Sequence, residues 1–233
     1  MKKNIILTAI ILIVGVLMVL SSFSVMGPTD AFAQSSRKVL MIPREGDSTD
    51  LDLMITKEVG VMTALLKNAG FEVDIATPSG QPFLGPTKKI EKVLRLSKID
   101  PNNYAGIIMP CMAMGAFPGP AVPPETVAVV KKALSDGKPV AAAYGSIIIL
   151  AEAGLLKGKK YAFPHDALKT EEQHKPDLRF KDAIYSGPGV VQDGKIITSG
   201  VCPNIEKQYG MTYGWKDGTV ELTQKFIAAI GSK

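Results

Sequence analysis

A strand, a sharp turn and a helix follow one another without interruption between Pro139 and Lys160, and this run constrains the fold more than any other part of the chain. Its sequence, PVAAAYGSIIILAEAGLLKGKK, predicts a short buried strand over Val140–Ala143 and then a helix that ends at Gly154. In α/β folds such an elbow raises one side chain above the carboxyl ends of the strands and points backbone N–H groups at whatever binds there. Here the raised side chain is the phenol of Tyr144.

Predicted strands and helices alternate along the rest of the chain. Asp193-Gly194, between two short apolar runs, is the strongest hairpin signal. Alternation of this kind favours a mainly parallel sheet with helices on both faces, to which the hairpin adds an antiparallel excursion. We therefore expect one α/β domain over residues 37–231, a flavodoxin-like three-layer sandwich. The expected strands are 38–42, 71–76, 106–109, 140–143, 190–192 and 195–198, and the expected helices are 55–68, 90–96, 124–135 and 219–230.

The first 33 residues have the pattern of a secretory signal peptide. Lys2 and Lys3 precede an apolar stretch over Ile5–Leu20, and Ala31-Phe32-Ala33 provides a small-x-small cleavage site. The alternative is an uncleaved membrane anchor, because the apolar stretch can be counted as far as Met26. Both readings place the domain outside the cytoplasm, secreted or anchored to the outer face of the membrane. Contact with a membrane is expected only if the segment is not cleaved.

Composition narrows the choice of partners. The net charge is +5, but the lysines are spread along the chain and no basic block carries interleaved aromatic residues. We therefore expect no nucleic-acid partner. The chain has two cysteines, Cys111 and Cys202, too few for a disulfide framework, although an oxidising location would permit a single bridge between them.

The elbow and the following AEAGLLKG resemble the ThiJ/PfpI family, also called the DJ-1 superfamily, whose usual pattern is A-A-x-C-H-G-P followed by L-A-x-A-G-L-L-x-G. A second stretch, ITKEVGVMTALLKNAGFEVDIATPSG, supports the resemblance. The match puts the nucleophilic cysteine of the family on Tyr144, its histidine on Gly145 and its glycine on Ser146. The resemblance thus implies a member that lacks the nucleophilic cysteine. It also implies a homo-oligomer, and no cofactor is expected.

The resemblance assigns further site positions. Glu58 matches the glutamate that hydrogen-bonds the nucleophilic thiol; the alternative is a carboxylate in the first turn of a helix, stabilised by the helix dipole. Cys111 and Met112 stand where the family has a glycine pair that supplies backbone donors to an oxyanion. Cys202 follows a predicted strand near the pocket. Cys111 is either a relocated thiol or a small buried hydrophobe.

Other polar and sulfur-containing side chains are candidates for the site. Tyr144 would act as a general acid if its pKa were depressed from about 10, or would plug the pocket with its ring. Ser146 fits a helix-capping role better than that of a nucleophile. The stretch MPCMAM over 109–114 contains soft ligands that select Cu(I), but methionine also fills irregular cores, and no metal site is predicted. Many family members have a His-Pro pair after the elbow helix, whereas this chain has the reverse order, Pro164-His165. We expect His174 to be solvated.

Two functions are compatible with this pattern. The first is an extracytoplasmic pseudoenzyme that binds a small ligand or a protein partner at a pocket around Glu58 and Tyr144, lined also by Met112, Gly145, Ser146 and Cys202. The alternative is a hydrolase or glyoxalase-like enzyme that acts on carbonyl or acyl substrates, with Cys111 as the nucleophile and Glu58 as the proton acceptor.

Overall fold

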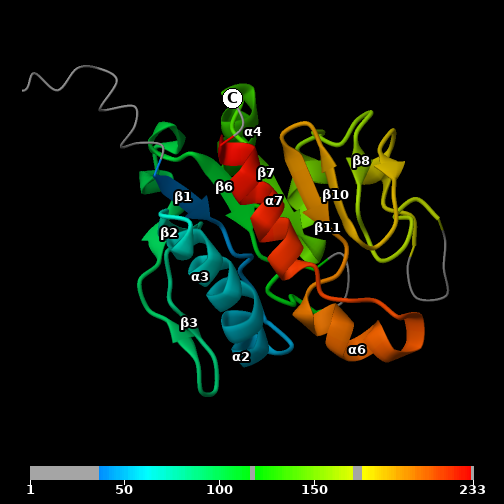
Figure 1. Cartoon of the computed structure of the whole chain (residues 1–233), viewed down its shortest axis with the longest axis horizontal. Coiled ribbons are helices and arrows are strands. Elements are labelled where there is room, and N and C mark those ends of the chain that lie inside the picture. The colour runs from blue at the N-terminus through cyan, green and yellow to red at the C-terminus, as the bar shows by residue number, and fades with distance from the viewer. Residues whose placement is uncertain (1–36, 116–118, 170–174, 232–233) are drawn as a thin grey trace, which may run out of the picture.

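A seven-stranded sheet forms the centre of the molecule (Figure 1). The computed structural model describes residues 37–115, 119–169 and 175–231. Five neighbouring pairs of the sheet are parallel, and β10 and β11 form the antiparallel hairpin predicted around Asp193-Gly194. The strand order is β10-β11-β7-β6-β1-β2-β5, with β1 Lys38–Met41, β2 Glu72–Thr77, β5 Leu94–Arg95, β6 Gly106–Met109, β7 Val140–Ala143, β10 Val190–Asp193 and β11 Ile196–Ser199.

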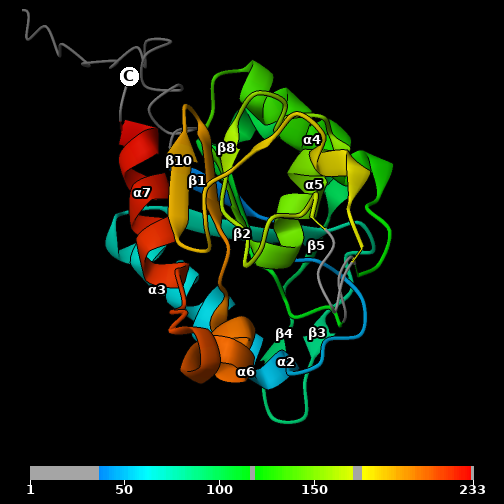
Figure 2. The ribbon, with the colours of Figure 1, turned by 90° about the vertical axis from the view of Figure 1, so that its right-hand side faces the viewer.

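Helices cover both faces of this sheet, which confirms the predicted flavodoxin-like α/β sandwich. Figure 2 shows α3 and α7 on one side of the sheet and α4 and α5 on the other. The central strands β6 and β7 are buried along their whole length, as expected for parallel strands covered twice. The helices are α2 Leu51–Met54, α3 Gly60–Asn68, α4 Pro124–Ser135, α5 Ile147–Glu152, α6 Pro203–Tyr213 and α7 Thr219–Gly231, with a π-helical turn at Ile55–Val59 joining α2 to α3.

The two layers of core use alternate residues of the same strands. Leu40, Ile107 and Ala142 pack toward the side of α4 and α5. Val39 and Ile108 pack toward the side of α3 and α7. Successive side chains of a strand point to opposite faces, so a continuous apolar strand supplies both cores at once.

Most predicted elements agree with the structure to within one residue at each end, and two differ by more. The helix expected at 90–96 is wrong: this segment contributes the last residue of β4 (Lys89–Ile90) and the edge strand β5, which pairs with β2. Pairing with an existing sheet edge prevails over a weak local helical pattern. The first long helical segment begins at Leu51 rather than at Ile55, because the carboxylate of Asp50 accepts a hydrogen bond from the Leu53 N–H and caps it.

Some elements had no counterpart in the sequence prediction. These are α6 and the short strands β3 (Phe83–Leu84), β8 (Lys160–Tyr161) and β9 (Ile184–Tyr185). The segment 1–33, interpreted as a signal peptide or anchor, lies outside the described residues. Within the residues that are described, none of the helices has the length and apolar character needed to cross a membrane.

Candidate functional site

Four strand ends bring the candidate residues together. Arg44 follows β1, Cys111 follows β6, Tyr144 follows β7 and Cys202 follows β11, and these strands are neighbours in the order β11-β7-β6-β1. The carboxyl ends of parallel strands meet at one edge of the sheet, where ligands of open α/β folds bind. The topology therefore gathers side chains that lie far apart in the sequence into one site.

Glu58 lies at the floor of this site. It belongs to the π-helical turn and is completely buried. Its Oε1 accepts a hydrogen bond from the Cys111 N–H at 2.9 Å, and its Oε2 accepts one from the Met112 N–H at 3.1 Å. Burial, and next the proximity of Cys111, raise the pKa of Glu58 well above its usual value and so favour the protonated carboxyl, against the opposing effect of the two backbone N–H groups.

The two amides that Glu58 engages belong to a tight turn after β6. Met112 and Ala113 have φ values of 63° and 51°, in the left-handed region that non-glycine residues seldom adopt. The backbone N–H groups at 111 and 112 point toward the buried interior of the site. Their acceptor is the Glu58 carboxyl.

Cys111 places its sulfur directly on the elbow. Its Sγ accepts a hydrogen bond from the Gly145 N–H at 3.4 Å, and its thiol is hydrogen-bonded to that of Cys202. The hydrogen bond from Cys202 lowers the pKa of Cys111; the amides of Gly145 and Ala113 and the positive charge of Arg44 add to this, against the opposing effect of burial. The pKa of Cys202 is raised, by burial and then by Cys111. Both thiols are free and buried, with exposed fractions of 2% and 0%.

Arg44 ties the elbow to the loop after β6. Its Nη1 donates to the Gly145 carbonyl at 2.9 Å and its Nη2 donates to the Pro120 carbonyl at 2.5 Å. A Cβ placed on Gly145 would lie 3.3 Å from the Cys111 Sγ and 3.5 Å from Arg44 Nη1. The site therefore leaves space for glycine at this position and little for a larger residue. Arg44 is a site residue that the sequence did not predict; the only signal was a charged residue three positions after a buried strand.

Tyr144 occupies the tip of the elbow. Its φ of 25° is a strained value, of the kind that a nucleophile elbow imposes. Its ring packs on Phe163 with 5.1 Å between centroids. Burial raises the pKa of Tyr144, so the depressed pKa that general-acid chemistry would need is not found. The alternative expectation, a ring that fills the pocket, agrees with this packing.

Ser146 does not cap the elbow helix as predicted. Its hydroxyl donates to the Pro110 carbonyl at 2.6 Å, and the start of α5 has no side-chain cap. The hydroxyl instead ties the elbow to the end of β6, because a buried donor finds the nearest free carbonyl.

Comparisons with known proteins agree with this geometry. The DJ-1/PfpI family model matches residues 37–207. This chain belongs to the DJ-1/PfpI family. An uncharacterized protein of Methanocaldococcus jannaschii is 29% identical over 177 residues, which are 75% of this chain and 79% of the relative.

Solved structures share the DJ-1/PfpI fold. A ThiJ/PfpI domain protein from Brachyspira murdochii has a TM-score of 0.60 at 15% identity, covering 85% of this chain and 98% of that one. The oxidized DJ-1 of Toxoplasma gondii has a TM-score of 0.52 at 23% identity, covering 83% of this chain and 97% of that one. At these identities the likeness shows the fold alone.

Of the two histidines of this DJ-1/PfpI domain, His165 lies beside the elbow. The His165 ring meets Phe163 edge to face, with 5.3 Å between centroids. His174 lies outside the described residues. Among the described residues, no group of three His, Cys, Asp or Glu side chains is arranged to hold a metal ion.

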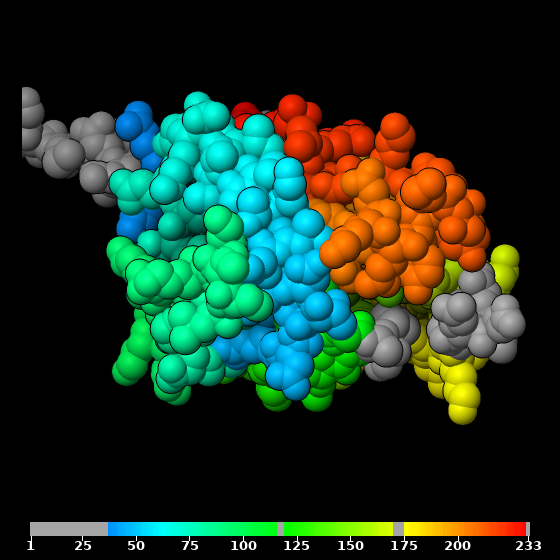
Figure 3. All heavy atoms as spheres, turned by 90° about the horizontal axis from the view of Figure 1, so that it is seen from below, coloured from blue at the N-terminus to red at the C-terminus, as the bar shows by residue number. Residues whose placement is uncertain are grey.

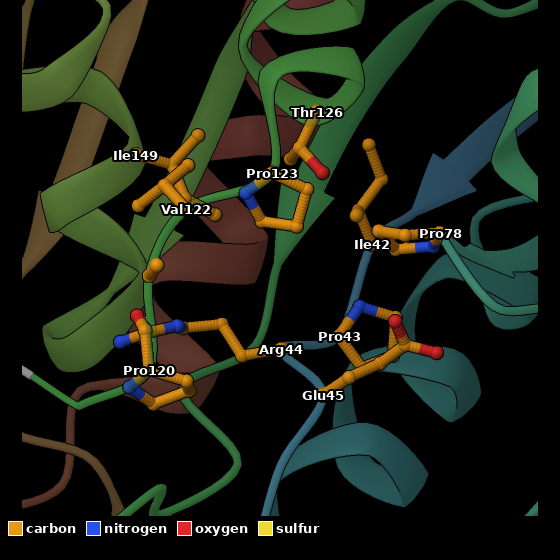
Figure 4. Close-up of a pocket in the computed structure, with 11 residues that line it drawn as sticks. Ile42, Pro43, Arg44, Glu45, Pro78, Pro120, Val122, Pro123, Thr126 and Ile149 are labelled. Atoms are coloured by element: carbon orange, nitrogen blue, oxygen red, sulfur yellow. The ribbon is translucent and has the colours of Figure 1, made fainter.

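A cleft opens beside the site, on the far side of Arg44 (Figure 4). It encloses about 350 Å³, including the solvent at its mouth. Its walls are mostly apolar, and Arg44 and Glu45 are its charged residues; the others are Ile42, Pro43, Pro78, Pro120, Ala121, Val122, Pro123, Thr126 and Ile149. The lining includes neither Glu58 nor Tyr144.

Helices α2 and α6 lie side by side on the face seen in Figure 3, where α6 is orange. The Lys207 Nζ of α6 contacts the Asp50 carboxylate at 2.6 Å. Asp50 caps α2, which leads into the turn of Glu58, and Cys202 is the residue directly before α6. This pair of helices therefore joins the two sides of the thiol site.

Proposed function

We propose that this chain is an extracytoplasmic, thiol-dependent enzyme that acts on small carbonyl or acyl compounds with Cys111 as its nucleophile. One observation carries the proposal: the Cys111 Sγ accepts the N–H of Gly145, the residue after the elbow tip. The family resemblance puts its nucleophile one position earlier, on Tyr144. The reactive sulfur thus comes from the neighbouring strand end and reaches the same elbow.

The environment of the sulfur favours its ionised form. A thiolate is the nucleophilic form of cysteine, and the lowered pKa of Cys111 increases its fraction at neutral pH. The thiolate would form a C–S bond with the carbonyl carbon while the electron pair of the C=O bond moves to oxygen.

Glu58 then supplies a proton rather than accepting one. Its raised pKa favours the protonated carboxyl, which accepts the backbone N–H of Cys111. A neutral carboxyl can protonate the oxygen that develops negative charge. The sequence predicted Glu58 as the proton acceptor, whereas here it is proposed as the proton donor.

The second candidate is binding without thiol chemistry, at the Glu58 and Tyr144 pocket expected from the sequence or at the cleft beside Arg44. The burial of both thiols favours it, since a buried thiol is usually inert. It predicts a small-molecule ligand whose affinity does not depend on Cys111.

Thiol reactivity and turnover separate the two candidates. Alkylation of the reduced protein by iodoacetamide across pH, read at Cys111 by mass spectrometry, should give an apparent pKa below the usual value of about 8.5. Turnover of methylglyoxal or 4-nitrophenyl acetate should be lost in Cys111→Ser and kept in Cys202→Ser. An apparent pKa at or above the usual value, with turnover equal in wild type and Cys111→Ser, would leave only the binding function.

Location and assembly belong to the proposal as well. The apolar segment Ile5–Leu20 and the site Ala31-Phe32-Ala33 support export. N-terminal sequencing of the protein recovered from expressing cells should give Gln34 as the first residue, whereas an intact Met1 in the membrane fraction would indicate an anchor. The family resemblance supports a homo-oligomer, which light scattering of the purified protein would test.

A further inference from the structure

The two cysteines of the chain form a buried pair. Cys111 follows β6 and Cys202 follows β11, two strands that are separated in the sheet by β7. Their side chains nevertheless converge beneath the elbow, because their thiols are hydrogen-bonded to each other. Both lie in the same apolar cluster, between the sheet and the helices α3 and α7.

The two sulfurs have different surroundings. Cys111 accepts the Gly145 N–H and lies close enough to Arg44 to feel its charge. Cys202 precedes α6, and burial and then Cys111 disfavour its ionisation. The surroundings therefore favour the thiolate at Cys111 and the thiol at Cys202. Cys111 is thus suited to attack a substrate, and Cys202 is the thiol next to it.

We propose that Cys111 and Cys202 are a redox-active dithiol that reduces small hydroperoxides and closes to an intramolecular disulfide. The inference rests on the proposed function, because both need a reactive Cys111. It adds a second reacting residue, Cys202, and a second class of substrate.

The reaction proceeds in two steps. The Cys111 thiolate attacks one peroxide oxygen, so an S–O bond forms, the O–O bond breaks, and the alkoxide or hydroxide leaves with a proton from the Glu58 carboxyl. The Cys202 sulfur then attacks the Cys111 sulfenic acid, so the S–S bond forms and the S–O bond breaks. The departing hydroxide takes the Cys202 thiol proton and leaves as water. Glu58 then regains from solvent the proton that Cys111 released when it ionised. In sum, one hydroperoxide and two thiols give one alcohol or water, one further water and the disulfide.

The geometry favours this oxidant over larger ones. With exposed fractions of 2% and 0%, the sulfurs admit a reagent of a few atoms more readily than a protein disulfide or a bulky hydroperoxide. Closing the bond brings the two sulfurs to about 2.05 Å. Both side chains lie in one buried cluster and interact there, so the two cysteines are neighbours in the fold before any bond forms.

The experiment uses the purified, reduced protein and one equivalent of hydrogen peroxide. We expect thiols titrated after denaturation to fall from two to none per chain, and a non-reducing peptide map to show the Cys111–Cys202 bridge within one chain. Cumene hydroperoxide, which is bulkier, should react at least tenfold more slowly. Two thiols remaining after excess peroxide, or a bridge between chains in place of the internal one, would overturn the proposal.

Variants separate this proposal from the carbonyl chemistry. In Cys202→Ser, whose hydroxyl can still donate to the Cys111 sulfur, Cys111 should react with peroxide but stop at the sulfenic acid, which dimedone traps. Cys202→Ala, which lacks that donor, should react more slowly and also stop at the sulfenic acid. Circular dichroism would show that each variant folds.

The patterns of failure differ. Loss of carbonyl turnover in all proteins, with the disulfide still forming, would remove the proposed function and leave the dithiol. A sulfenic acid that accumulates equally in wild type and Cys202→Ser would remove the dithiol and leave Cys111 as a lone nucleophile.

Discussion

The replacement Glu58→Gln tests the electrostatic basis of the site. The side chain is completely buried, and its two oxygens each accept a backbone N–H, from Cys111 and from Met112. Glutamine keeps the shape and supplies one carbonyl oxygen, but its NH₂ group then faces the second amide. One buried N–H loses its acceptor.

The cost follows from that lost acceptor. A buried donor left without a partner costs about 1–3 kcal/mol, and the overall shape is otherwise conserved. We therefore expect Glu58→Gln to lower the free energy of unfolding by about 1–3 kcal/mol at pH 5. The exposed Glu72, whose side chain is 74% accessible, provides the control: Glu72→Gln should change stability by less than about 0.5 kcal/mol.

The pH dependence of this difference tests the protonation state. The folded pKa of Glu58 is raised above its usual value of 4.5, so the folded protein holds a proton that the unfolded chain releases. The contribution of Glu58 is fully present below pH 4.5 and is lost as pH rises toward the folded pKa, at up to about 1.4 kcal/mol per pH unit. Glutamine has no such proton, so the gap between wild type and Glu58→Gln should narrow from pH 5 to pH 8.

Urea unfolding at four pH values between 5 and 8 measures this gap, because other titrating groups are shared by the two proteins. A gap that stays constant over this range would show that Glu58 is already ionised at pH 5, and the proposed proton donor would be lost. The Glu72→Gln control should give a flat line in either case.

The other predictions concern the contacts of the sulfur. Gly145→Ala should slow alkylation of Cys111 about tenfold or shift its apparent pKa, since the new Cβ would lie 3.3 Å from the Sγ; Gly189→Ala, with open space around its Cβ, should change neither. Arg44→Gln should raise the pKa of Cys111, seen in its alkylation profile, and should destabilise the fold by about 1.5–3 kcal/mol through lost charged hydrogen bonds. Tyr144→Phe should remove one tyrosine that ionises only at strongly alkaline pH, as followed by ultraviolet absorbance; loss of a tyrosine that ionises near the usual pH of about 10 would contradict the burial of that hydroxyl.

Local sequence signals predicted most of the fold. The prediction of 124–135 matches α4 at both ends, because Pro124 starts the helix and Asp136-Gly137 ends it. The elbow and the hairpin were predicted for the same reason, since turn residues fix both. α6 was missed because its residues after Ile205 are largely polar and exposed, so no apolar stripe marks it.

The site was only partly predictable. The residues Glu58, Cys111, Tyr144 and Cys202 were identified individually, but their contacts depend on strand order and on loops that the sequence does not encode locally. The hydrogen bond between the two thiols is the clearest case, since it crosses the sheet from β6 to β11. Glu58 was expected to accept a proton, as an ionised carboxylate would. Its pKa is raised by burial, and the sequence does not reveal that burial.

The backbone N–H groups of Cys111 and Met112 donate to Glu58, and this affects which reaction the site favours. Acyl transfer depends on backbone donors that stabilise a tetrahedral oxyanion. Here those two N–H groups are held by the Glu58 carboxyl, and the Gly145 N–H is held by the Cys111 sulfur. What Glu58 offers instead is a proton, which suits a reversible thiol adduct of an aldehyde or the departure of a peroxide oxygen. We therefore expect methylglyoxal to be turned over faster than 4-nitrophenyl acetate, and the opposite order would mean that substrate displaces Glu58 from its amides.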